Sequence, residues 1–154
     1  MNAILTSLIA VLGTLLGSAM THGFQQRSAR RTEDGARAER LRQERLDVYG
    51  SYAGLLVEFR QAMLHHWFCV HEGRDAEDEP ALRARSFELR SAAQNALFRL
   101  RLVTEEAEVV AAADAAFREV GKLDRPADRD GLLPRRDATR ELIDAFVTTA
   151  GHHV

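Results

Sequence analysis

Residues 41–67 read LRQERLDVYGSYAGLLVEFRQAMLHHW, and this stretch predicts the central helix of the protein. Its apolar side chains recur at spacings of three, four and seven residues, the periodicity of one face of an α-helix. Further apolar residues widen that face, so we expect a helix that is buried on more than one side. The apolar positions are Leu41, Leu46, Val48, Tyr49, Tyr52, Ala53, Leu55, Leu56, Phe59, Met63, Leu64 and Trp67.

Downstream of this stretch, the sequence predicts shorter helices joined by turns. Residues 73–80 (GRDAEDEP) combine a C-capping glycine, an acidic loop and a proline able to begin a helix. Helical periodicity returns over 81–103, and Thr104 resembles an N-cap for a third helix that ends near Val120. We therefore expect an all-α bundle of three or four helices over residues 41–154.

The end of the chain predicts a loop followed by a final helix. Residues 121–134 hold two prolines and two glycines, which favour a loop. Residues 135–150 then show helical periodicity again. The side chains expected to face inward from this last helix are Ala138, Leu142, Ile143, Phe146 and Val147.

Upstream, residues 25–40 predict a charged helical stalk. Seven arginines and five acids lie between Arg27 and Asp47, with no aliphatic residue larger than Ala before Leu41. No proline precedes Glu79, so we expect one long helix that is solvated on all sides in this part.

The first 24 residues predict a transmembrane helix. Residues 3–24 (AILTSLIAVLGTLLGSAMTHGF) carry no charge apart from His22 when it is protonated. A helix of this length spans about 33 Å, enough to cross a bilayer core of about 30 Å. Arg27, Arg30 and Arg31 follow at the lipid headgroups, which predicts an outside N-terminus and a cytoplasmic C-terminal domain at the inner membrane. The alternative is a signal peptide cleaved near Ala19, although its basic n-region is missing.

Small residues suggest that the chain associates with copies of itself. Ala10, Gly13 and Gly17 share one side of the predicted span, and small residues let helix backbones approach closely in lipid. Gly50 and Gly54 repeat the GxxxG spacing in the bundle. Since each glycine costs about 1 kcal/mol of helix propensity, we expect another helix to approach closely there, the alternative being a kink.

Two further segments resemble a known group of proteins. The glycine-bearing span is followed by QQRSARR at 25–31 and by ERLRQERLDVY at 39–49. This order resembles the uncharacterised single-span membrane proteins of actinobacteria that carry a cytoplasmic helical bundle. The resemblance implies an architecture but no activity or catalytic residue.

One cluster suggests metal chemistry. His65, Cys69 and Glu72 share a helix face and are competent zinc ligands, and His152 and His153 would complete a site. The alternatives are a histidine pH or redox sensor, or histidines that lie at the tip of the bundle beside a buried Cys69. None of the familiar metal-binding signatures accompanies the cluster.

Composition narrows the classes of function. The formal net charge is −2, which does not favour nucleic acid, and the single cysteine excludes an intramolecular disulfide. The arginines between 83 and 101 are interpreted as a solvated face. No nucleotide-binding or hydrolase motif is found, so we expect no cofactor and no enzymatic activity.

We therefore predict a non-enzymatic membrane protein that assembles with itself or holds a protein partner at the inner membrane face. Its predicted parts are a transmembrane helix (1–24), a stalk (25–40) and a helical bundle (41–154). The alternative functions are a small pore-forming effector, in which the spans form a ring, and a sensor centred on the His65 cluster.

Overall fold

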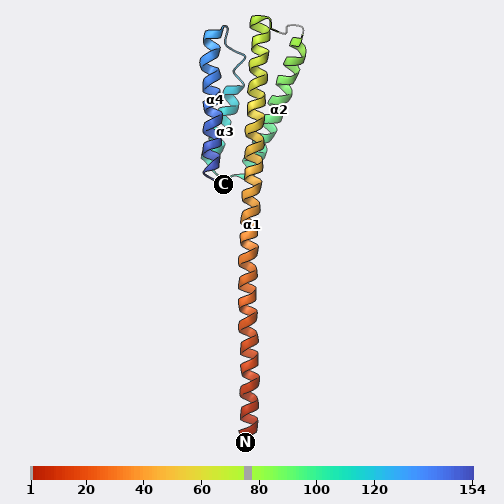
Figure 1. Cartoon of the computed structure of the whole chain (residues 1–154), viewed down its shortest axis with the longest axis vertical. Helices are drawn as coiled ribbons and strands as arrows, with labels where there is room; N and C mark the ends of the chain where they lie inside the picture. The colour runs from red at the N-terminus through yellow and green to blue at the C-terminus, as the bar shows by residue number, and fades with distance from the viewer. Residues whose placement is uncertain (1, 75–77) are drawn as a thin grey trace. The chain divides into compact units, whose positions relative to one another are not determined.

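The computed structural model describes the backbone of residues 2–74 and 78–154 and the side chains of residues 33–74 and 78–154. Over these residues the chain is all-α, with helices α1 (Asn2–Glu72), α2 (Glu79–Val103), α3 (Ala107–Val120) and α4 (Arg129–Gly151). The chain divides into two units, residues 1–41 and 42–154. In the second unit the four helices form a bundle (Figure 1), which confirms the predicted all-α bundle and fixes its number of helices at four.

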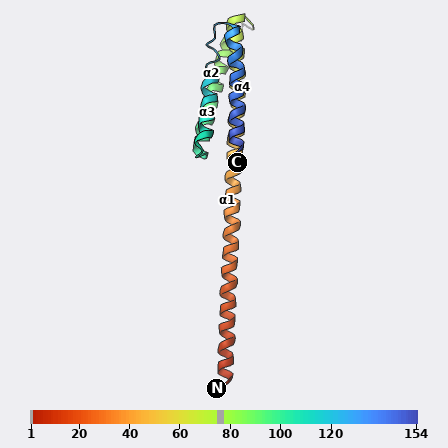
Figure 2. The ribbon, with the colours of Figure 1, turned by 90° about the vertical axis from the view of Figure 1, so that its left-hand side faces the viewer.

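The bundle has an up-down-up-down arrangement. Consecutive helices run antiparallel, and the two views together place α1 beside both α2 and α4, with α3 completing the second layer (Figures 1 and 2). Short connections favour this topology because each helix packs against the one that precedes it. The C-terminus consequently lies at the same end of the bundle as the connection between α2 and α3 (Figure 1).

The core combines large side chains from α1 with small ones from its neighbours. Tyr52, Leu56 and Phe59 of α1 are fully buried, and alanines on α2 and α3 allow close helix packing against them. The periodicity of residues 81–103 predicted the buried face of α2 correctly. The buried apolar positions contributed by α2, α3 and α4 are Leu89, Ala93, Ala96, Leu97, Leu100, Val109, Ala113, Ala116, Val120, Leu132, Ile143, Phe146 and Ala150.

The predicted turn between the first two helices of the bundle is confirmed at both described ends. Gly73 has a φ of 66°, the left-handed conformation that glycine adopts without strain. Its N–H donates to the carbonyl of Cys69 at 3.1 Å, which satisfies one of the last carbonyls of α1. Pro80 lies in the first turn of α2, where its missing N–H costs no hydrogen bond.

The start of α4 differs from the prediction. The helix begins at Arg129 rather than at 135, because the Asp128 side chain accepts a hydrogen bond from the Gly131 N–H at 2.8 Å and caps it. Pro134 lies inside the helix close to its N-terminus, so the loop predicted over 121–134 is too long. A proline there removes one backbone hydrogen bond while the cap holds the first turn.

The inward face of α4 is also corrected. Ile143 and Phe146 are buried as expected, whereas Ala138 is exposed and Val147 is half-exposed. The earlier start of the helix adds Leu132 to the core, and Thr139 and Ala150 are also buried.

The first residues of the apolar stripe on α1 and its two glycines are more open than expected. Leu41 is 54% exposed and Leu46 is 37% exposed, so the buried part of α1 begins at Val48. A Cβ added at Gly50 or Gly54 would meet no atom within 4 Å. The expected close approach of another helix at these glycines is therefore not present among the described residues.

The connection into α3 is tighter than the predicted capping pattern. The helix begins at Ala107 with Glu106 as its N-cap, and not directly after Thr104. The Thr104 hydroxyl nevertheless accepts a hydrogen bond from the Glu106 N–H at 3.3 Å, and Thr104 itself is buried. Thr104, which was predicted to be the N-cap, therefore lies two residues before the true N-cap and accepts a hydrogen bond from its backbone N–H.

A difference in helix length shapes one end of the bundle. The 14 residues of α3 are far fewer than the 25 of α2. The α3–α4 connection, residues 121–128, therefore faces the first half of α2 in place of a helix. Leu123 and Pro126 of this connection are buried, and the Pro126 carbonyl accepts a hydrogen bond from Trp67 Nε1–H at 2.7 Å.

Among residues 33–74 and 78–154, no helix has the length and hydropathy that crossing a membrane requires. The predicted transmembrane helix, residues 1–24, lies outside the described side chains.

Candidate functional site

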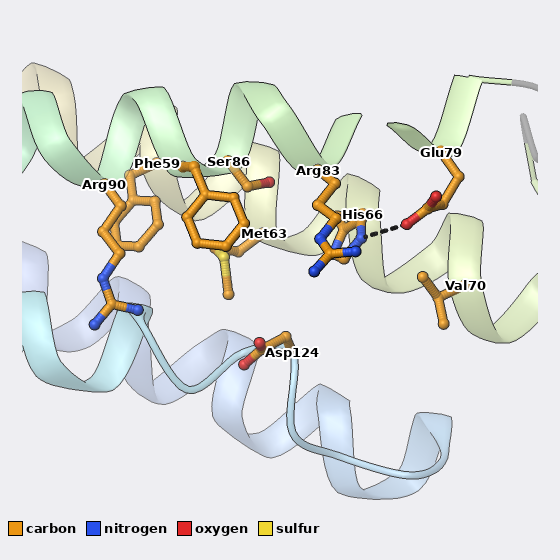
Figure 3. Close-up of a pocket in the computed structure, with 10 residues that line it drawn as sticks. Phe59, Met63, His66, Val70, Glu79, Arg83, Ser86, Arg90 and Asp124 are labelled. Carbon is orange, nitrogen blue, oxygen red and sulfur yellow. Dashed lines mark hydrogen bonds and ion pairs between the residues drawn. The ribbon is translucent and has the colours of Figure 1, made fainter. Parts of the chain in front are cut away.

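A hollow of about 320 Å³ lies between α1, α2 and the α3–α4 connection (Figure 3). It exists because the connection is less bulky than the helix that would otherwise face α2. The hollow is named here after the two arginines that α2 contributes, the Arg83–Arg90 hollow. A concave site with apolar and polar walls at the junction of several elements is the usual form of a binding site.

The floor of the hollow is apolar and is part of the core. Phe59 and Met63 of α1 are 0% and 6% exposed, respectively. Phe59 packs against Phe117 of α3 with 6.0 Å between the ring centroids. Buried Ser86 of α2 also lines the hollow, and its hydroxyl donates to the Leu82 carbonyl at 3.0 Å. The floor is therefore preformed by packing that the bundle needs for its own stability.

Two arginines from α2 border one side of the hollow. Arg83 and Arg90 are seven residues apart, so they share a helix face, and both are exposed. Neither forms an ion pair with any residue whose side chain is described. Phe87 lies between them in the sequence and is 60% exposed. This side of the hollow therefore offers two available cations beside an exposed aromatic ring.

Two acids lie elsewhere around the same hollow. Glu79 Oε1 is 3.4 Å from His66 Nε2, an interaction drawn in Figure 3. Asp124 comes from the α3–α4 connection, across the hollow from α2 (Figure 3). The hollow thus has its arginines on α2, the Glu79 carboxylate at the end beside His66, and the Asp124 carboxylate opposite. Such a site favours a ligand that carries apolar and acidic groups in a fixed order.

The predicted metal ligands are not brought together. Cys69 is buried, His65 is exposed, and the Glu72 carboxylate contacts Arg74 Nη2 at 2.9 Å and Arg129 Nη1 at 4.0 Å. Within the described part of the chain, no three His, Cys, Asp or Glu side chains form a group that could hold a metal ion.

The other histidines take structural positions. His71 stacks on Trp67 with 4.5 Å between the ring centroids, and its Nδ1 lies 3.1 Å from the Trp67 carbonyl oxygen. His153 Nε2 lies 2.6 Å from Glu108 Oε1, at the end of the bundle opposite His65. The C-terminal histidines therefore do not complete a site around His65.

Of the residues predicted to mediate oligomer contact, Gly50 lines a second hollow. This apolar hollow of about 220 Å³ lies between α1 and α4, beside Val147 and Gly151. Gly54 is exposed and lies outside it. Ala10, Gly13 and Gly17 lie outside the described side chains, as do the headgroup arginines Arg27, Arg30 and Arg31.

The Arg83–Arg90 hollow was not predicted from the sequence. The arginines of α2 were interpreted as a solvated face, and Phe87 was given no role. A signal was present, because Phe87 and Phe98 are eleven residues apart and both lie outside the predicted core face of α2. Two aromatic residues on the solvent face of one helix are an unusual use of such side chains.

Comparison with known proteins identifies a family. The family model of the KilB plasmid transfer protein matches residues 46–154, which include the bundle from its first core residues to the last residue of the chain. No curated protein and no solved structure matches the chain. The match identifies no family of membrane proteins, and it begins after most of the segments that resemble the actinobacterial single-span proteins. It covers more than half of the chain and includes every residue of the Arg83–Arg90 hollow, and on this evidence the chain belongs to the KilB plasmid transfer protein family.

Proposed function

We propose that the chain is a non-enzymatic, membrane-anchored component of plasmid transfer. Its bundle would hold a partner protein, or further copies of the chain, at the cytoplasmic face of the membrane. The observation that carries the proposal is the uncharged stretch at 3–24 followed at once by Arg27, Arg30 and Arg31, joined to a bundle of a plasmid transfer family. The uncharged stretch and the arginines support membrane anchoring and its orientation. The family match supports a role in plasmid transfer.

The surface of the bundle supports a role in binding. The Arg83–Arg90 hollow and the apolar hollow at Gly50 are both open to solvent within the described unit. Exposed apolar side chains beside each of them are the surface features that protein partners cover. These hollows lie on different sides of the bundle, one against α2 and the other against α4, so a partner and a second copy would not compete for one surface.

Deleting residues 3–24 is expected to move the protein from the membrane fraction to the soluble fraction and to reduce plasmid transfer strongly. The reason is that this uncharged, mainly apolar stretch supplies the affinity for the bilayer core. Fractionation and mating assays in a plasmid-bearing host measure both effects. The control replaces 3–24 with a leucine-rich span of equal length, which should restore membrane association. A deletion variant that stays in the membrane after alkaline extraction would contradict the anchor.

The orientation is tested in the same cells. Protease added to spheroplasts should leave a C-terminal tag intact, because the arginines that follow the span hold the bundle in the cytoplasm. Removal of the tag by external protease would contradict the proposed topology, even if the chain is anchored.

Replacing Gly13 and Gly17 with Ile is expected to reduce the oligomer to smaller species in detergent. Branched side chains at these positions would separate helix backbones that the glycines allow to touch, which removes the close packing on which association in lipid depends. Crosslinking followed by gel analysis, or analytical ultracentrifugation, measures the change. Leu8→Ile with Leu15→Ile is the matched control, since these leucines lie largely away from the small-residue side. An unchanged oligomer in the glycine variant would show that the side of the span with Gly13 and Gly17 is not the oligomer contact.

A further inference from the structure

We propose that the outward face of α2 binds an acidic amphipathic helix of a partner protein. This α2 face consists of Arg83, Phe87, Arg90, Phe98 and Leu102, with the Arg83–Arg90 hollow at one end. The inference rests on the proposed function, because it names the chemistry of the partner that the bundle would hold.

Large apolar side chains are exposed along α2. Leu102 is 85% exposed, Phe87 is 60% exposed and Phe98 is 48% exposed. Spacings of eleven and four residues place them in one stripe, on the side of α2 away from the buried residues of its core face. None of the three helps to close the core. A row of large apolar side chains that folding does not need marks a surface for another protein.

Positive charge lies beside that stripe. Arg83 and Arg90 lie along one edge and form no ion pair with a described residue. Arg101 continues the edge beside Phe98, where its guanidinium carbon is 5.9 Å from the ring centroid, but Asp114 already holds it at 2.6 Å. Two cations therefore remain available, and a partner that supplies carboxylates at their spacing would be complementary.

The α2 face has a length and shape that suit a second helix. From Arg83 to Leu102 the face is roughly 29 Å long, which matches about five turns of a second helix. The hollow of about 320 Å³ at its end has Phe59 and Met63 as its floor, so it can receive an apolar side chain of that helix. A helix whose apolar side packs into such a groove contacts it through side chains spaced three, four and seven residues apart.

Two other occupants fit the surface less well. A nucleic-acid duplex presents phosphates but little apolar surface, and it would leave Phe87, Phe98 and Leu102 uncovered. An anionic bilayer would cover them, yet it would also bring phosphates against Asp124 on the opposite side of the hollow. A protein helix can place acids opposite Arg83 and Arg90 and none opposite Asp124, which is the selectivity that this arrangement favours.

The binding test uses the full chain in detergent micelles and a labelled synthetic helix of about five turns. The probe peptide carries leucines at spacings of three and four and glutamates beside them, and its counterpart has lysine at every glutamate position. Fluorescence anisotropy should show that the glutamate peptide binds and that the lysine peptide binds about tenfold more weakly or not at all. Equal binding of the two peptides would overturn the proposal.

Charge reversal identifies the surface. Arg83→Glu with Arg90→Glu should weaken binding of the glutamate peptide by about tenfold or more. The matched control is Arg135→Glu with Arg140→Glu, which makes the same change of charge at exposed positions of α4 and should leave binding within about twofold. An equal loss in both pairs would mean that only net charge matters, which would overturn the assignment to the α2 face.

The same surface is examined in cells with a photoreactive phenylalanine analogue at Phe87 or Phe98. The expected adduct joins the chain to a partner segment that alternates acidic and apolar residues with helical spacing, and Val57 is the control because it is exposed to a similar degree on α1 and lines neither hollow. An adduct of twice the chain mass, an adduct with lipid or DNA, or no adduct at either position would overturn the proposal. Membrane fractionation of the same cells separates a failed anchor from a failed docking surface.

Discussion

Replacing Trp67 with Ala is expected to lower the free energy of unfolding by about 3–5 kcal/mol, the largest effect of any single change predicted for the bundle. The side chain is 2% exposed and packs edge-to-face on Phe68, with 5.2 Å between the ring centroids. Its Nε1–H also donates to the Pro126 carbonyl at 2.7 Å, and the truncation leaves that carbonyl without its donor. Both losses act at the point where the α3–α4 connection closes the bundle.

Urea unfolding of the full chain in micelles, followed by the helical circular dichroism signal, measures this change. Tryptophan fluorescence is unsuitable because Trp67 is the only tryptophan. Trp67→Phe should cost less, about 1–3 kcal/mol, since it keeps a ring and loses chiefly the hydrogen bond. Leu102→Ala is the exposed control and should stay within about 0.5 kcal/mol of the unmodified protein. A loss below about 1 kcal/mol for Trp67→Ala would show that the connection does not depend on this anchor.

Replacing Tyr52 with Ala is expected to cost nearly as much, about 3–5 kcal/mol, because the ring is fully buried at the centre of the bundle. It meets Phe146 of α4 edge-to-face at 5.2 Å, and its hydroxyl donates to the Ala113 carbonyl of α3 at 2.9 Å. One side chain therefore joins three helices. The same urea experiment measures the loss, and Tyr52→Phe should lose only the hydrogen bond, about 1–3 kcal/mol at neutral pH.

The Tyr52 hydroxyl also makes stability depend on alkaline pH. Burial raises the pKa of Tyr52 well above its ordinary value of 10.0, and nearby Asp114 adds to the shift while Arg101 opposes it. The unfolded chain therefore releases this proton near pH 10 while the folded chain keeps it. Ionisation of Tyr52 therefore does not affect the free energy of unfolding below pH 10. Above pH 10 it lowers the free energy of unfolding by up to about 1.4 kcal/mol per pH unit.

Tyr52→Phe isolates that contribution. The variant cannot ionise at this position, so its deficit relative to the unmodified chain should shrink as the pH rises above 10. A deficit that stays constant up to pH 11 would contradict the assignment of the shift to Tyr52.

Local chemistry made much of the fold predictable. Gly73 and Pro80 are residues whose backbone preferences mark a helix end and a helix start without help from distant contacts. The apolar periodicity of α2 likewise identified its core face correctly. The start of α4 was missed because Pro134 was interpreted as part of a loop, although Asp128 in fact caps a helix that tolerates this proline. A capping side chain and a proline compete, and only the packed structure decides between them.

The candidate site could not be predicted in the same way. Its floor, Phe59 and Met63, was correctly expected to be apolar, but nothing local indicates that a hollow opens above it. The hollow depends on where α3 ends relative to α2, which is a tertiary property. The same limit applies to Gly50 and Gly54, since helical spacing shows which residues share a face but not whether another helix of the same chain covers them.

The brevity of α3 has a consequence for how the size of the hollow can change. The floor of the hollow belongs to the core and tolerates little change, whereas its opening depends only on how soon the third helix stops. Adding about three turns to that helix would seal the hollow without altering any side chain that α1 or α2 contributes. Insertions near Gly121, and not only substitutions, are therefore expected to change the volume of the hollow while the bundle keeps the same core.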